Sequence, residues 1–100
     1  MKSFGDMVKQ AQKLQKQMGE MQEKLAEERY EASAGGVVKA VVDGKQMLRE
    51  IKISPETLKD GDVTLIEDLV MAAVSEAQHA SEKQMQATLG KLTGGFPLPF

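Results

Sequence analysis

Six apolar residues near the start of the chain recur at alternating steps of four and three, and this pattern constrains the fold more than any other feature. They are Met7, Ala11, Leu14, Met18, Met21 and Leu25. This is the heptad spacing of a helix that packs along one narrow seam. Ser3, followed by Asp6, predicts the helix N-cap. A single helix over residues 4–28 would be about 37 Å long, so we expect part of it to project from the body.

The spacing leaves open whether this seam closes within one chain or between two chains. One hundred residues form one domain, which buries only about 60–65% of the surface of its unfolded chain. Only 4% of the residues are aromatic and seven are Met, so the core is expected to be thin. Oligomerisation is a common remedy for a thin core. Together with the excess length of the helix, this favours closure of part of the seam between chains.

Charge is distributed unevenly along the predicted helix. The net charge of the chain is −2, which by itself does not indicate a nucleic-acid partner. Residues 1–16, however, carry four lysines and one acid, whereas residues 17–31 carry five acids and two bases. The helix is therefore expected to have a basic tip and an acidic base. Lys9, Lys13 and Lys16 share one helical face. From the net charge alone, we would interpret this face as a solvated surface and not as a nucleic-acid contact.

The middle of the chain changes to the two-residue period of strands. A short strand is predicted at 30–34, Gly35-Gly36 as a turn or bulge, and further strands at 38–42 and 47–53. Asp43-Gly44 predicts a type I′ turn with two residues of positive φ. The expected result is an antiparallel meander of two or three strands.

A second helical segment follows, after Ser54-Pro55 ends the last strand. Residues 56–58 predict a short turn, and Asp62 predicts the N-cap of a long helix. One apolar face is expected from residues that recur at helical spacing. They are Ile66, Leu69, Val70, Ala73, Ala77 and Ala80, widened by Leu65, Met71 and Val74. Gly90 and Gly94-Gly95 are stop signals, and the tail is not expected to be helical.

No residue pattern indicates catalysis or a cofactor. The chain has no Cys, which excludes a disulfide framework and a thiolate metal site, and His79 is its only histidine. Glu76, His79 and Glu82 could share a helical face, but a di-iron bundle needs further ligands from other helices, so we predict a solvated or packing histidine instead. No segment has the pattern of a signal peptide or membrane span, which predicts a soluble, cytoplasmic protein. The lack of a catalytic constellation predicts that it is not an enzyme.

Several segments together resemble the YbaB/EbfC family of bacterial nucleoid-associated proteins. The segments are residues 8–12 (VKQAQ), 35–39 (GGVVK), the Asp43-Gly44 turn, 51–55 (IKISP), 67–73 (EDLVMAA) and 95–100 (GFPLPF). Their order and spacing carry the resemblance, which covers nearly the whole chain. Two departures stand out: Ser54 replaces a frequent Asp, and Val74-Ser75 replaces a more usual Phe-Asn pair.

The resemblance implies an α+β homodimer shaped like tweezers, with a long N-terminal helix, a three-stranded antiparallel meander and a long C-terminal helix. It would be a single domain over residues 1–100, with a helical arm (1–28), the meander (29–55), a helical segment (56–92) and a tail (93–100). It also implies that the protein binds duplex DNA in the nucleoid, with a role in nucleoid organisation or gene regulation.

On this reading Lys9, Lys13 and Lys16 are the predicted phosphate contacts, joined by Lys2, Lys83 and Lys91. No Arg cluster or aromatic platform is present to read bases, so binding is expected to depend mostly on backbone charge. The alternative is a protein-interaction module that uses the helical arms for coiled-coil-like contacts, with the lysines as a solubilising surface.

Overall fold

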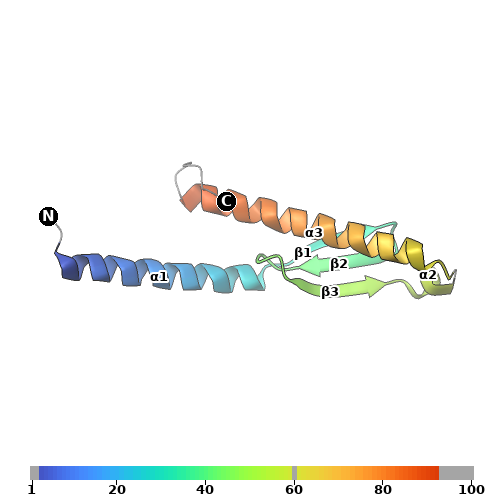
Figure 1. The fold of residues 1–100 in the computed structure, drawn as a ribbon, viewed down its shortest axis with the longest axis horizontal. Helices are drawn as coiled ribbons and strands as arrows, with labels where there is room; N and C mark the ends of the chain where they lie inside the picture. Colours follow the sequence, from blue (N-terminus) through green and yellow to red (C-terminus); the bar gives the residue numbers. More distant parts are fainter. Residues whose placement is uncertain (1–2, 60, 93–100) are drawn as a thin grey trace.

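The computed structural model describes residues 3–59 and 61–92 (Figure 1). Three helices and three strands follow the order α1 (Phe4–Glu27), β1 (Tyr30–Ala34), β2 (Val38–Val42), β3 (Leu48–Ile53), α2 (Pro55–Lys59) and α3 (Val63–Leu92). The strands form one antiparallel sheet in the order β1-β2-β3. The predicted α+β class and the three-stranded meander are therefore confirmed.

The core lies between one face of the sheet and the first half of α3. Ala40 of the central strand pairs with Ala32 on β1 and with Ile51 on β3, and all three face the helix. Buried small residues let the helix approach the sheet closely. The fully enclosed cluster is Val38, Ala40, Val42, Ala73 and Ala77. As the low aromatic content predicted, this core is thin.

The predicted type I′ turn at Asp43-Gly44 is wrong. Neither residue has positive φ; the left-handed residue of this connection is Gln46, with φ 65°. The backbone N–H of Gln46 donates to the Asp43 carbonyl at 3.1 Å, and that of Asp43 donates to the Met47 carbonyl at 2.9 Å. This is a three-residue loop that ends in a left-handed residue. The paired positive φ angles occur instead at Gly35 and Gly36, which confirms a turn there.

The apolar face predicted for the second long helix is buried or half-buried at Ile66, Leu69, Val70, Ala73, Val74 and Ala77, but the prediction is wrong at Leu65, Met71 and Ala80. Asp62 caps α3 as predicted, accepting a hydrogen bond from the backbone N–H of Leu65 at 3.0 Å. Ala80, however, is exposed, and its neighbour Ser81 is fully buried. Gly90 does not stop the helix, which continues to Leu92.

The molecule is long and narrow, with principal extents of 71 × 22 × 16 Å. Its radius of gyration is 19.5 Å, whereas a compact 100-residue domain has about 13 Å. α1 and the second half of α3 extend from the same end of the sheet and diverge (Figure 1). The N-terminal helix therefore projects, as its length predicted. Among the described residues, no helix combines the length and apolar character needed to cross a membrane.

Candidate nucleic-acid interface

α1 is a helix whose surface is almost entirely in water. The side-chain oxygen of Ser3 accepts a hydrogen bond from the backbone N–H of Asp6 at 3.2 Å, which confirms the predicted N-cap. Only Leu25 is buried, and Met21 and Ala26 are half-buried. Because the partial positive charge of the helix dipole lies at the N-terminal end, it adds to the lysine charge near the tip.

Lys9, Lys13 and Lys16 form a row along one face of the first half of α1. All three side chains are exposed, and no ion pair engages any of them within the described part of the chain. With 3.6 residues per turn, steps of four and three keep the amines on one side of the helix. We call these three residues the lysine row. It is the largest set of adjacent, unpaired cations that the described residues present.

The second half of α1 carries the opposite charge. Glu20, Glu23 and Glu27 are exposed there, with Lys24 among them. Gly19 lies between the two halves, and the space around its Cα is open, with no other atom within 4 Å of where a Cβ would be. An anion that follows the outer surface of α1 would therefore meet attraction near the tip and repulsion near the sheet.

The predicted seam lies on the opposite side of α1 from the lysine row. Lys16 is nine residues from both Met7 and Leu25, which is about two and a half turns and therefore the opposite face. Leu25 is buried and Met21 half-buried, but the outer part of the seam is uncovered: Met7 is 59%, Leu14 58% and Met18 49% exposed. Ala11 is exposed as well.

A groove of about 530 Å³ lies beside the seam, between α1 and the projecting half of α3. Its lining consists of Leu14, Gln17, Met18, Glu20, Met21, Lys24 and Thr88. Three seam residues therefore face the space between the two projecting helices. None of the lysine row lines this groove.

The base of α1 is fixed to the hairpin between β2 and β3. The Leu25 carbonyl accepts hydrogen bonds from the backbone N–H groups of Gly44, at 2.8 Å, and Glu28, at 3.2 Å. A Cβ on Gly44 would lie 2.7 Å from that carbonyl oxygen, so the contact requires glycine. Beside it the Tyr30 hydroxyl donates to the Glu28 carboxylate. Burial, this hydrogen bond and the Glu28 charge raise the pKa of Tyr30 to about 12.

Asp43 joins this hairpin to α3 through a buried carboxylate. Its oxygens accept hydrogen bonds from the backbone N–H groups of Lys45, at 2.8 Å, and Met47, at 3.0 Å, and from Arg49 Nε at 2.9 Å. The Ser81 hydroxyl donates to its carbonyl at 2.7 Å. Burial alone would raise the pKa of Asp43, but the hydrogen bonds and the Arg49 charge outweigh it and hold that pKa below its usual value.

We call Asp43, Gly44, Arg49 and Ser81 the anchor. Sequence reasoning missed it, because it assigned Asp43-Gly44 to a local turn and Ser81 to no role. Sequence reasoning also missed a β-bulge in this hairpin, where the register shifts between Val41 and Val42 opposite the start of β3. This shift interrupts the strict alternation predicted for Met47, Arg49 and Ile51.

The remaining predicted DNA contacts lie apart from the lysine row. Lys83 and Lys91 are exposed on α3, beyond the fully buried Ser81. They therefore belong to the other projecting helix and not to α1. Lys2 lies outside the described residues, as does the tail at 93–100.

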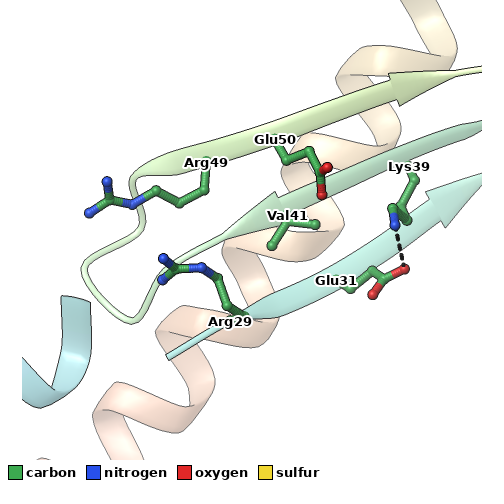
Figure 2. Close-up of a pocket in the computed structure, with 6 residues that line it drawn as sticks. All are labelled: Arg29, Glu31, Lys39, Val41, Arg49 and Glu50. Carbon is green, nitrogen blue, oxygen red and sulfur yellow. Dashed lines mark ion pairs between the residues drawn. The ribbon is translucent and has the colours of Figure 1, made fainter. Parts of the chain in front are cut away.

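The outer face of the sheet is also charged, but its charges alternate and are paired. A shallow hollow of about 510 Å³ there is lined by Arg29, Glu31, Lys39, Val41, Arg49 and Glu50 (Figure 2). The Lys39 amine lies 3.4 Å from Glu31, and Arg49 pairs with Asp43 at 2.8 Å. Arg29 donates to the carbonyls of Ala26 and Glu28. This face therefore offers a phosphate less unpaired positive charge than the lysine row.

His79 does not form a metal site with its neighbours. His79, Glu76 and Glu82 are all exposed on α3. Within the described ranges, no group of three or more His, Cys, Asp or Glu side chains is placed to hold a metal ion.

Comparison with known proteins agrees with this architecture. The sequence pattern of the YbaB/EbfC DNA-binding family matches residues 1–96. A nucleoid-associated protein of Caldanaerobacter subterraneus subsp. tengcongensis is 42% identical over 98 residues, covering 97% of this chain and 88% of the relative. One from Clostridium acetobutylicum is 40% identical, with the same coverage of both chains.

A solved structure supports the fold independently. An uncharacterized protein from Helicobacter pylori superimposes with a TM-score of 0.80 at 17% identity, over 93% of this chain and 99% of that one. Fold and sequence thus define a small α+β protein with projecting helices, of the class named for DNA binding. The chain belongs to the YbaB/EbfC DNA-binding family.

Proposed function

We propose that this protein is a nucleoid-associated protein that binds duplex DNA as a homodimer, through contacts with the phosphate backbone. The observation that carries the proposal is the lysine row: three exposed cations without ion pairs among the described residues, on one face of a projecting helix. Family membership and the names of the relatives support DNA as the ligand and the nucleoid as the location.

The exposed seam supports the homodimer. Leu14 and Met18 sit at heptad spacing on a helix that a single chain leaves largely uncovered. Apolar side chains with this spacing are covered by another helix in stable proteins. A second copy supplies such a helix without a further partner.

Binding through phosphates requires no catalytic group and gives a simple prediction about salt. Each phosphate contact adds about −0.9 to the slope of log affinity against log salt concentration. Lys83 and Lys91, at the end of the other projecting helix, and Lys2 are proposed as secondary contacts. Sequence preference is expected to be weak, because phosphate contacts fix position and do not read bases.

Mobility-shift titrations of a duplex at several salt concentrations, beside a sizing measurement, test this function. We expect the Lys9→Ala/Lys13→Ala/Lys16→Ala variant to bind more weakly and with a shallower salt slope. Lys45→Ala/Lys52→Ala/Lys59→Ala removes the same charge from exposed positions on the body and should bind nearly as the unchanged protein does. No binding at low salt, or equal losses in both variants, would contradict the proposal.

A second candidate is a protein-interaction module, which the exposed seam also favours. Here the seam would bind another protein's helix, and the lysine row would only maintain solubility. Affinity capture with and without nuclease separates the two. A protein partner that persists after nuclease treatment supports the module, whereas its loss on nuclease treatment supports DNA binding.

A further inference from the structure

The two opposite faces of α1 have a consequence for how DNA can be arranged around a dimer. Leu14, Met18 and Met21 of the seam face the groove beside α3, whereas the lysine row is about half a turn from the seam and lines no part of that groove, although Glu20, one turn beyond Lys16, does. Protein contact and phosphate contact therefore use separate surfaces of one helix. Covering the seam leaves all three amines accessible.

The groove between the projecting helices is not suited to hold a duplex. Its volume is about 530 Å³, and its lining combines the apolar side chains of Leu14, Met18 and Met21 with two uncharged polar residues, one acid, Glu20, and one base, Lys24. Apolar walls cannot replace the water and counterions around phosphates, and the opposite charges of Glu20 and Lys24 leave the groove without a net attraction for them. The outer surface near the tip has the opposite character, since exposed Lys9, Gln12, Lys13 and Lys16 share that region.

In a dimer whose two seams face each other, the two lysine rows point away from each other, because each row is about half a turn from its seam. One straight duplex can lie along one such row but cannot reach the other on the far side. We propose that the homodimer bridges two DNA duplexes, each bound to the outer face of one α1. This inference rests on the proposed function, and it places the DNA outside the pair of arms.

The number of contacts per duplex follows from the length of the row. Lys9 to Lys16 spans about 10 Å of helix, so one row can contact at most three phosphates with its three amines. The three amines of one row should then contribute about −2.7 to the salt slope for one duplex, whereas for a single duplex gripped by both rows this contribution would be about −5.4. A small number of contacts per duplex also means that each end of the bridge exchanges readily.

A two-duplex capture assay tests the bridge. A biotinylated duplex on beads is mixed with the full-length protein and with a fluorescent duplex that carries no biotin. We expect protein-dependent retention of fluorescence, which falls again at high protein concentration as each duplex becomes saturated with its own dimers. The Lys45→Ala/Lys52→Ala/Lys59→Ala variant should retain fluorescence as the unchanged protein does.

Mixed dimers sharpen the test. A heterodimer of one unchanged chain and one Lys9→Glu/Lys13→Glu/Lys16→Glu chain can be purified through two different tags. It should bind the bead duplex, but it should capture at least about tenfold less fluorescence than the unchanged dimer. If the unchanged dimer binds the bead duplex but captures no second duplex, or if the heterodimer captures as much as the unchanged dimer, bridging is wrong and DNA binding stands. No binding to the bead duplex would overturn the proposed function itself.

Discussion

The two ends of α1 are built in contrasting ways. At its base Leu25 is buried, and its carbonyl is held by the Gly44 backbone, which is itself next to the buried carboxylate of Asp43. At its tip the side chains are exposed and the lysines are unpaired among the described residues. Folding constraints are therefore concentrated at the base of α1, so residues at the tip can be chosen for binding. Changes at the base should affect stability, and changes at the tip should affect binding alone.

The largest loss of stability is expected from Asp43→Ala. This change removes the acceptor of two backbone N–H groups and of the Arg49 guanidinium at a fully buried site. We expect the free energy of unfolding to fall by about 3 kcal/mol. Urea denaturation measures it. Glu50→Ala, on the exposed outer face of the sheet, is the control and should change stability by less than about 0.5 kcal/mol. Similar losses for both variants would show that Asp43 has no special role in stability.

A smaller loss is expected from Gly44→Ala. The added Cβ would lie 2.7 Å from the Leu25 carbonyl oxygen, so either the hairpin or the end of α1 must shift. The expected cost is about 2 kcal/mol, as for an overpacked core. The control is Gly19→Ala, which meets open space and should stabilise α1 slightly by improving helix propensity. Thermal unfolding of both variants, followed by circular dichroism, checks the opposite signs.

Acid should remove part of the contribution of Asp43. Its pKa in the folded protein is held below the usual value, so its stabilisation is fully present above the usual carboxyl range and disappears as pH falls through the lowered pKa. Asp43→Asn cannot ionise. The stability difference between the unchanged protein and this variant should therefore shrink from about pH 6 to about pH 2. Urea titrations across that range measure it, and a difference that stays constant would refute the role of the ionised carboxylate.

The smallest effect on stability is expected from Lys9→Ala/Lys13→Ala/Lys16→Ala. These side chains are exposed and make no ion pairs within the described ranges, and Ala is the better helix former. The free energy of unfolding should change by less than about 0.5 kcal/mol, while affinity for duplex DNA falls. A loss of stability similar to that of Asp43→Ala would show that the lysines at the tip also stabilise the fold.

The features that the sequence predicted correctly are those set by local spacing. The heptad steps predicted α1, and Ser3 and Asp62 predicted the N-caps of α1 and α3. Gly35-Gly36 predicted a turn. The errors at Asp43-Gly44 and Ala80 occur where distant residues meet. Asp43-Gly44 has the composition of a tight turn, but its backbone bonds to Leu25 and Ser81 select another conformation. Ser81, not Ala80, lies on the buried face, because the Ser81 hydroxyl donates a hydrogen bond to the Asp43 carbonyl there.

The candidate site divides in the same way. The lysine row follows from helical spacing, so its common face and its position opposite the seam could be worked out from the sequence. The pairing of the outer sheet face could not, because it depends on which strand neighbours bring Lys39 to Glu31 and Lys52 to Glu50. Without that pairing the arginines and lysines of the sheet would have looked like equal candidates for phosphate contact.

Because the hydrogen bond from Gly44 holds α1 near one end only, a small rotation there moves the distant tip of the helix a long way. α1 is 24 residues long, or about 36 Å, and it is fixed only near its C-terminal end, where Leu25 is buried and its carbonyl accepts hydrogen bonds from Gly44 and Glu28. A rotation of about 10° at that end moves the tip by about 6 Å, more than the ~3.4 Å between successive base pairs of a duplex. A shift at the base too small to disturb the sheet could therefore move the lysines from one phosphate to the next.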